Sequence, residues 1–252
     1  MDLNNKINLD DGYFFGRGAF ETILVLKEPV FLQLHLKRLN SSLKFLNIDK
    51  VITEKEVLEK IKELNIKNEA LKIAVSKENV LFTKRKVPYT EENYKKGFDV
   101  KISNSKRNEY SSITYLKSLS YLENIIEKEN AKKEGFHESI FLNTKNYLAE
   151  GSVSNLFFIK NKKIYTPQIN CGILPGTIRG FLIDNIESIG YEIVEGDFTI
   201  NQLLNCDGAF LTNSLMGIMK INSLNNKKIK ESEITEEISK FYKKQITLSY
   251  DR

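Results

Sequence analysis

A Pro-Gly turn leads directly into an amphipathic segment near the middle of the second half of the chain. Residues 173–180 read Ile-Leu-Pro-Gly-Thr-Ile-Arg-Gly. The first N–H groups of a helix have no partners inside the helix, and the helix dipole places partial positive charge there. If a helix begins at Thr177, its first turn is predicted to form an anion site suited to phosphate, with the Thr177 hydroxyl as an added donor. The alternative is an ordinary turn with an N-capping threonine.

Arg38 is a second candidate anion ligand. It lies in the run His35-Leu36-Lys37-Arg38-Leu39, where Leu36 and Leu39 have helical spacing. A guanidinium group offers two parallel donors to phosphate oxygens. The alternative is a solvated arginine on a helix, and we interpret His35 as structural.

Lys117 and Glu150 are the candidate amine and acid. Lys117 stands among apolar and aromatic neighbours in residues 115–122, and a desolvated lysine can act as an amine nucleophile. Glu150 closes an apolar stretch and enters a run of small residues, 151–155. Each has a simpler interpretation, since the chain is rich in lysine and Glu150 could be the edge of a turn.

Taken together, these features describe the needs of one cofactor. A phosphate clamp, an amine that forms a Schiff base and a carboxylate for a ring nitrogen are what pyridoxal 5′-phosphate requires. The carboxylate keeps the pyridine nitrogen protonated, so that the ring can accept electrons.

The first half of the chain predicts a sheet with two helices. Residues 19–26 are β-rich, 31–46 carry leucines at helical spacing, and 53–64 form a second amphipathic pattern. Residues 70–75 and 80–83 predict a hairpin, and 98–102 predict a further strand. The polar, turn-rich run 103–109 then favours a junction between domains.

The second half mixes strands and helices as well. Helices are predicted at about 119–134, 177–189 and 234–248, with Gly190 ending the second. Strands are predicted at 138–142, 156–159, 163–166 and 209–212. The fold class is therefore mixed α/β in two domains: a smaller N-terminal domain over 1–104, a linker over 105–111 and a larger cofactor-binding domain over 112–252.

Five segments, in one order along the chain, resemble the class IV (fold-type IV) pyridoxal-phosphate enzymes. They are residues 18–22, His35 with Arg38-Leu39, 116–119, 150–155 and 174–179. Five ordered motifs are more specific than any one of them. The resemblance implies a fold like that of D-amino acid aminotransferase, with two α/β domains, the cofactor between them and a homodimer around it.

The same resemblance implies a role for each site residue. Lys117 is the catalytic Schiff-base lysine, and Glu150 is the partner of the pyridine nitrogen. Leu174 packs on the ring, and Asn155 lies with the cofactor-binding residues. The implied phosphate ligands are Arg38, Thr177, the Ile178 N–H and Ser214. No metal is implied.

Residues 212–219 favour the aminodeoxychorismate lyase branch of that family. Transaminases of the class usually carry small hydroxyl residues and a glutamate here, whereas this chain has Leu215, Met216 and Gly217. An apolar wall suits a cyclohexadiene ring better than an amino-acid carboxylate. The expected reaction converts 4-amino-4-deoxychorismate to 4-aminobenzoate and pyruvate, with Lys117 as general base. Arg107 is expected to meet a substrate carboxylate.

Two departures and two alternatives accompany this interpretation. Lys220 stands where a proline is usual, and the strand before Asp10 looks short. A transaminase of branched-chain or D-amino acids would share every cofactor residue. A basic binding module without a cofactor would make the five motifs a coincidence.

Composition excludes several other classes. The 252 residues are 41% hydrophobic and 28% charged, which is ordinary for a globular protein. The net charge of +5 is modest, and aromatic residues do not interleave with the basic clusters, so nucleic-acid binding is not expected. No apolar run reaches the ~20 residues that span a bilayer. Two cysteines and a polar N-terminus favour a reducing cytoplasm, with a small molecule as substrate.

Overall fold

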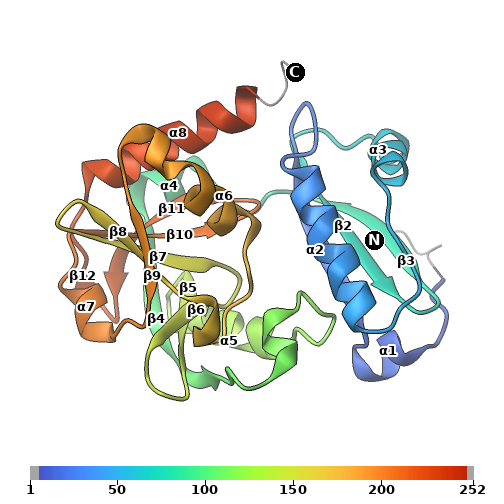
Figure 1. The fold of residues 1–252 in the computed structure, drawn as a ribbon, viewed down its shortest axis with the longest axis horizontal. Helices are drawn as coiled ribbons and strands as arrows, with labels where there is room; N and C mark the ends of the chain where they lie inside the picture. The colour runs from blue at the N-terminus through green and yellow to red at the C-terminus, as the bar shows by residue number, and fades with distance from the viewer. Residues whose placement is uncertain (1–5, 249–252) are drawn as a thin grey trace. The chain divides into compact units, whose positions relative to one another are not determined.

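The chain divides into two compact units (Figure 1). The structure is a computed structural model, and it describes residues 6–248. Unit 1 runs to Val87 and also includes Leu116–Tyr121. Unit 2 consists of Pro88–Tyr115 and of the chain from Leu122 onward. Helices and strands occur in both units, so the expected mixed α/β class is confirmed.

This division differs from the expected boundary at 105–111. Strand β4 (Phe98–Arg107) pairs in parallel with both β5 (Glu138–Asn143) and β11 (Gly217–Leu224), which places it inside the unit 2 sheet. Its polar residues remain in the strand because Glu127 accepts hydrogen bonds from the Ser103 and Ser105 hydroxyls. The polar composition of residues 103–109 therefore did not indicate a linker between domains.

Unit 1 is a three-stranded antiparallel sheet with helices packed on it. Its strand order is β1-β2-β3, and Gly18 lies opposite Ser76 while Val25 lies opposite Glu69. Alternate residues of β1 and β2 pack against Leu36, Leu39 and Leu43 of α2, as the helical spacing of the leucines predicted. The elements are α1 (Asp11–Phe15), β1 (Gly18–Val25), α2 (Leu32–Phe45), α3 (Glu54–Glu63), β2 (Glu69–Ser76) and β3 (Val80–Arg85).

A distant segment completes this sheet. Ser118 forms an antiparallel bridge with Ala19, the Phe20 N–H donates to the Lys117 carbonyl over 2.9 Å, and the Leu119 N–H donates to the Gly18 carbonyl over 2.9 Å. The helix expected from about 119 consequently begins only at Leu122, because residues 117–119 are extended along β1. The sheet of unit 1 thus fixes the backbone on which Lys117 lies.

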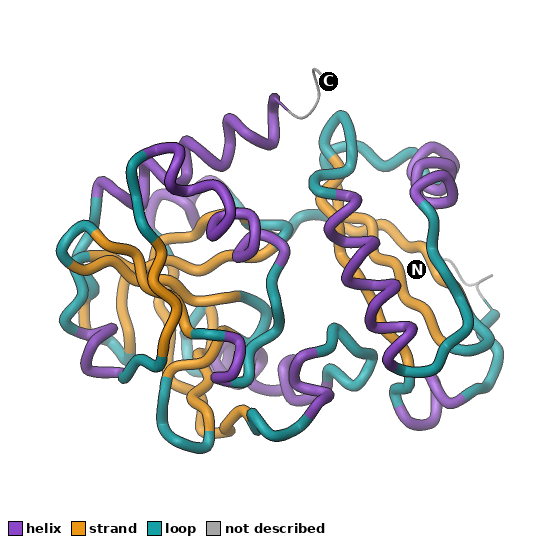
Figure 2. The backbone as a smooth tube through the Cα atoms, viewed as in Figure 1, coloured by secondary structure: helices purple, strands orange, loops and turns teal. Residues whose placement is uncertain are grey.

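Unit 2 is built on a nine-stranded sheet that closes on itself. The order is β10-β11-β4-β5-β6-β7-β8-β9, and the ninth strand, β12, pairs with β11 beside this path. Strand β10 also pairs with β7, which joins the two ends of the first six strands. Figure 2 shows these strands grouped together with helices at the outside of the group. The remaining elements are α4 (Glu91–Lys96), α5 (Leu122–Lys133), β6 (Leu148–Gly151), β7 (Asn155–Lys160), β8 (Lys163–Pro167), α6 (Thr177–Asn185), β9 (Ile193–Gly196), α7 (Ile200–Leu204), β10 (Gly208–Asn213), β12 (Lys227–Lys228) and α8 (Glu233–Leu248).

Apolar side chains fill the inside of this closed sheet. Val100, Ile140, Leu156 and Leu211 are buried there on four different strands. The helix predicted over 177–189 is divided: α6 ends at Asn185 and a 3₁₀ turn follows over Ile186–Ile189. Gly190 then adopts φ 83°, a left-handed conformation that ends the segment as predicted.

Candidate active site

Lys117 lies against two aromatic rings of unit 1. Its Nζ is 4.5 Å from the centroid of the Phe20 ring and 5.3 Å from that of Tyr121. The two rings meet edge to face, with their centroids 5.1 Å apart. Such faces attract an ammonium group and exclude water from one side of it. The half-buried lysine is therefore held on a fixed backbone with its amine directed along an apolar surface.

A buried carboxylate holds Arg38 in the same unit. Glu21 on β1 accepts from Arg38 Nε over 2.6 Å and from Arg38 Nη2 over 2.8 Å, and it meets His35 Nδ1 at 2.7 Å. This two-point contact fixes the plane of the guanidinium group. The Arg38 side chain is 15% exposed, whereas those of Glu21 and His35 are 1% exposed. An aimed, partly accessible cation is what an anion site needs.

The charge states of this cluster follow from its burial. Burial by itself would raise the pKa of Glu21, but the positive charge of Arg38 and the contact with His35 hold that pKa well below its usual range. Burial lowers the pKa of His35, so the ring is neutral at neutral pH. Glu21 was not among the predicted site residues. A single charged residue inside the strand 19–25 was the available signal.

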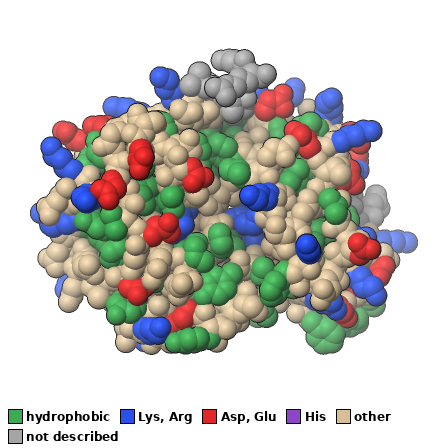
Figure 3. All heavy atoms as spheres, viewed as in Figure 1, with side chains coloured by type: hydrophobic (Ala, Val, Ile, Leu, Met, Phe, Trp, Pro, Cys, Tyr) green, Lys and Arg blue, Asp and Glu red, His purple; other side chains and the backbone are tan. Residues whose placement is uncertain are grey.

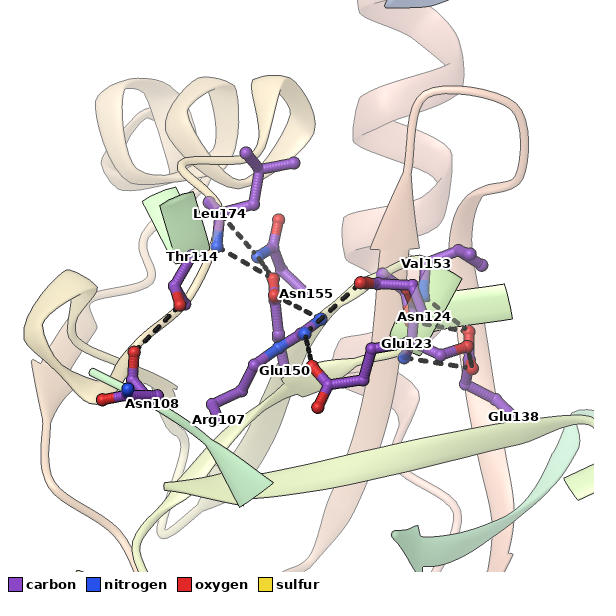
Figure 4. Close-up of polar contacts among 12 residues, drawn as sticks. Arg107, Asn108, Thr114, Glu123, Asn124, Glu138, Glu150, Val153, Asn155 and Leu174 are labelled. Atoms are coloured by element: carbon purple, nitrogen blue, oxygen red, sulfur yellow. Dashed lines mark hydrogen bonds and ion pairs between the residues drawn. The ribbon is translucent and has the colours of Figure 1, made fainter. Parts of the chain in front are cut away.

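Glu150, at the end of β6, lies at the centre of a second polar cluster, in unit 2 (Figure 4). Its Oε1 is 3.1 Å from Nη2 of Arg107. Its Oε2 accepts from the Leu174 N–H over 3.0 Å and from the Asn155 amide over 3.4 Å. The Asn155 amide also donates to the Leu174 carbonyl over 3.0 Å. The structure therefore brings together three of the predicted residues around one buried carboxylate.

Arg107 is buried among acids of the protein itself, which differs from its predicted contact with the substrate. We expected it to meet a substrate carboxylate, yet it is 6% exposed and contacts carboxylates of the protein itself. Its guanidinium carbon also lies 3.9 Å from the centroid of the Phe141 ring. A buried guanidinium group requires compensating acids, and here Glu150 is one of them. Arg107 is thus part of the support of Glu150.

A second buried acid, Glu138, holds the turn that joins Glu150 to Asn155. Its carboxylate accepts from the N–H and the hydroxyl of Ser152, and from the Ser154 hydroxyl over 3.2 Å. Asn124 donates to the Ser152 carbonyl over 2.6 Å. These contacts fix both ends of the hairpin that carries Glu150, and sequence patterns gave no indication of them.

The N-terminus of α6 has the form expected of an anion site. Gly176 precedes the helix, and no side chain in the described part of the protein caps its first turn. A Cβ at Gly176 would collide with Asn155 Oδ1, so only glycine permits this close approach. Thr177 and Ile178 are buried in the first turn, with 8% and 2% exposure. The donors of the turn are thus placed beside the Glu150 cluster by Asn155.

Ser214 lies in a turn after β10 that one side chain organises. Asn213 Oδ1 accepts from the N–H groups of Leu215 and Met216 over 3.0 and 2.9 Å, and its amide donates to the Val153 carbonyl over 3.2 Å. Met216 belongs to the core of unit 2, and Leu215 is buried as well. Ser214, which precedes them, is half-buried. The apolar wall expected of Met216 is therefore also a packing element.

The predicted site residues are divided between the two units. Unit 1 holds Lys117 and Arg38, whereas unit 2 holds Glu150, Asn155, Leu174, Thr177, Ile178 and Ser214. An amine, an acid, a guanidinium group and a helix terminus are the kinds of group that a phosphate-bearing pyridine cofactor requires. The Thr212 hydroxyl, buried and without a hydrogen-bond partner among the described residues, adds donor capacity next to Ser214.

Other kinds of site receive no comparable support. Within residues 6–248, no three His, Cys, Asp or Glu side chains gather closely enough to hold a metal ion. In the same stretch, none of the helices combines the length and the apolar composition needed to cross a bilayer. On the face that Figure 3 shows, lysine and arginine side chains alternate with acidic ones instead of forming one basic surface.

Comparisons with known proteins identify the family of this chain. The family model of amino-transferase class IV matches residues 18–224. Aminodeoxychorismate lyase of Bacillus subtilis is 31% identical, over 94% of this chain and 88% of the relative. A Methanocaldococcus jannaschii protein provisionally named a branched-chain-amino-acid aminotransferase is 27% identical over 93% of this chain and 88% of its own length.

Solved structures give the same result for the fold. A Legionella pneumophila structure, provisionally described as a 4-amino-4-deoxychorismate lyase, has a TM-score of 0.88 and 29% identity. The alignment covers 97% of both chains. From its motifs, its fold and these matches, the chain belongs to the class IV aminotransferase family of enzymes that depend on pyridoxal 5′-phosphate.

Proposed function

We propose that this enzyme is an aminodeoxychorismate lyase. It would convert 4-amino-4-deoxychorismate to 4-aminobenzoate and pyruvate, a step in folate biosynthesis. The Bacillus subtilis lyase, at 31% identity over 94% of the chain, is the observation that carries the proposal. The turn after β10 adds a structural argument for the same substrate.

The position of Gly217 has no room for the glutamate side chain that transaminases of the class usually carry near it. The residue has φ 62°, in the left-handed region, and a Cβ there would meet the ring of Tyr242. A glutamate would be strained in its backbone and would displace a buried ring. The turn from Ser214 to Gly217 thus favours an apolar ring substrate over recognition of an amino-acid side chain by an acid.

The roles of the cofactor-binding residues follow from the two clusters. When bound, pyridoxal 5′-phosphate supplies a ring that accepts electrons. Arg38, aimed by Glu21, and the first turn of α6 would hold its phosphate, with Ser214 as a further donor. Glu150, supported by Arg107, would keep the ring nitrogen protonated, and Leu174 would pack on the ring.

Lys117 would act as the attachment point and as the base. Its amine takes the proton from the substrate ring carbon next to the amino nitrogen. The bond to the enolpyruvyl oxygen breaks, the ring becomes aromatic, and the leaving fragment gains a proton to become pyruvate. Substrate and products balance without an oxidant, a reductant or a second substrate.

A class IV aminotransferase is the second candidate. The Methanocaldococcus jannaschii relative, at 27% identity, favours branched-chain amino acids as the substrates in that case. A D-amino acid transaminase would use the same cofactor residues. Both alternatives need an oxo-acid cosubstrate, whereas the lyase does not.

One pair of assays separates these functions. The purified holoenzyme is given aminodeoxychorismate in one reaction, and an amino acid with 2-oxoglutarate in the other. We expect 4-aminobenzoate to form faster than glutamate. Faster glutamate formation would assign the enzyme to the transaminases.

Lys117→Ala tests the residue assignment. We expect it to lose the visible band of the attached cofactor and at least roughly a thousandfold of the turnover, because both need the amine. Lys67→Ala, an exposed lysine of the same unit, is the control and should keep both. A Lys117→Ala protein that retains the band would move the attachment to another lysine.

We also propose that the enzyme is a homodimer, as the resemblance implies. Three consecutive aromatic residues of α1 support this, because Tyr13, Phe14 and Phe15 are 61%, 59% and 76% exposed. Contiguous exposed aromatic rings are typical of interfaces. Light scattering should give twice the mass of 29.1 kDa, and a monomer would contradict the proposal.

A further inference from the structure

One guanidinium group in unit 2 serves two carboxylates. Arg107 Nη2 lies 3.1 Å from Glu150, and Arg107 Nη1 donates to Glu123 over 2.9 Å (Figure 4). Nη1 also lies within 3.3 Å of Asn124 Oδ1. The cluster of Glu150, Arg107 and Glu123 therefore carries one positive and two negative charges when all are ionised.

The two carboxylates differ in their surroundings. The side chain of Glu150 is 7% exposed, whereas that of Glu123, in the first turn of α5, is 50% exposed. A buried acid that faces only a cation is fully compensated and attracts a further proton weakly. A second acid on the other side of the cation changes this balance, because the three groups then have a net charge of −1.

We infer that Glu123 offsets the charge of Arg107, so that Glu150 can hold a proton on the pyridine nitrogen of the cofactor. Glu123 is a positioning residue, since it acts through Arg107 and touches no reacting atom. Arg107 keeps Glu150 aimed, and Glu123 prevents Arg107 from neutralising it. This inference rests on the proposed role of Glu150, and it holds for a lyase and a transaminase alike.

The expected size of the effect is moderate. Because Glu123 is half exposed, water and salt screen its field. Two unit charges about 4 Å apart in water change an equilibrium constant by about fivefold when one of them is removed, and the effect is smaller for Glu123 because Arg107 lies between it and Glu150. Loss of the Glu123 charge should therefore weaken cofactor binding about two- to fivefold, and less at high salt than at low salt.

The test uses an isosteric neutral variant. Glu123→Gln keeps an oxygen that can accept from Arg107, while Glu123→Ala removes both charge and acceptor. Glu129→Gln, an exposed acid on the same helix, is the matched control. The chemical shift of nitrogen-15-labelled pyridoxal phosphate bound to each holoenzyme reports the protonation of the ring nitrogen, and titration of each apoenzyme gives the dissociation constant.

We expect Glu123→Gln and Glu123→Ala to lose protonated nitrogen and affinity to the same extent, with Glu129→Gln like the wild type. A Glu123→Gln variant that matches the wild type would overturn the inference, because geometry alone would then be sufficient. Glu150→Gln separates the role proposed for Glu150 from the role inferred for Glu123. If it leaves the nitrogen shift unchanged, the role proposed for Glu150 fails; if it abolishes protonation while Glu123→Gln does not, only this inference fails.

Discussion

Ionisable residues in the interior of the two units define the site at the scale of single side chains. Glu21, His35 and Arg38 form one cluster, and Glu150 with Arg107 forms another. Such residues cost free energy to bury unless each has a partner. Their presence in the interior of both units is therefore a sign of function, and each cluster surrounds a group that sequence reasoning had singled out.

Glu21→Gln is the sharpest test at this scale. It removes the negative charge that compensates Arg38, so we expect the free energy of unfolding to fall by about 3 kcal/mol. The affinity for inorganic phosphate and for pyridoxal phosphate should fall as well, because Arg38 loses its alignment. Urea denaturation and cofactor titration measure the two effects.

Glu28→Gln is the control for that experiment. Glu28 is exposed in the turn after β1, and surface substitutions of this kind usually change stability by less than about 0.5 kcal/mol. Equal stability of the two variants would show that Arg38 does not depend on Glu21.

At the scale of elements, the start of α6 is the critical feature. Gly176 brings the helix terminus against Asn155, which in turn contacts Glu150. Helix and hairpin are thus joined through a contact that has no room for a methyl group. The phosphate donors and the acid are set in one arrangement by this single close approach.

Gly176→Ala and Gly180→Ala form a matched pair on this helix. The first inserts a Cβ onto Asn155 Oδ1, so we expect a loss of about 1–3 kcal/mol and a cofactor affinity at least roughly tenfold weaker. The second meets no atom within 4 Å in the described structure, so it should stabilise the helix by about 0.5–1 kcal/mol. Thermal unfolding measures the change in stability of both variants, and cofactor titration measures the change in affinity. Similar behaviour of the two would remove the special role of Gly176.

At the scale of the whole molecule, carboxylates with lowered pKa values occur in both units. The Ser76 hydroxyl and nearby N–H groups lower the pKa of Asp10 from 3.8 to about 2. Donated hydrogen bonds outweigh the effect of burial at four acids of unit 2, whose pKa values are also lowered: Asp99, Glu109, Asp197 and Asp207. Both units therefore depend on ionised acids.

Acid should consequently destabilise the protein in a defined range. A carboxyl whose pKa is lowered by folding adds stability above its unfolded pKa of about 4, and this stability is lost as the pH falls toward the folded pKa. We expect the free energy of unfolding to begin to fall below about pH 6.5, where the unfolded His35 ring gains a proton that the buried ring resists, and to fall more steeply between about pH 4 and 2. Denaturant titrations across that range measure it.

Asp10→Asn isolates one contribution. The variant should be about 2 kcal/mol less stable at neutral pH, and the difference from the wild type should vanish near the folded pKa of about 2. A difference that persists at that acidity would show that Asp10 acts by packing and not by its charge.

Local patterns in the sequence determined a large part of this protein. The leucine spacing of 31–46 predicted α2, the β-rich run 19–26 predicted β1, and Gly190 marked the end of its helical segment. These features depend on neighbours within a few residues, and such neighbours are visible in the sequence itself.

Only the tertiary structure decided which residues contact the charged groups and which parts of the backbone approach other elements most closely. Residues 117–119 extend along β1, and Arg107 contacts Glu150. Tyr242 of α8 closes the space at Gly217. Each of these contacts joins different elements of the chain. Their geometry depends on how the sheets close, and hydrophobic periodicity carries no information about that.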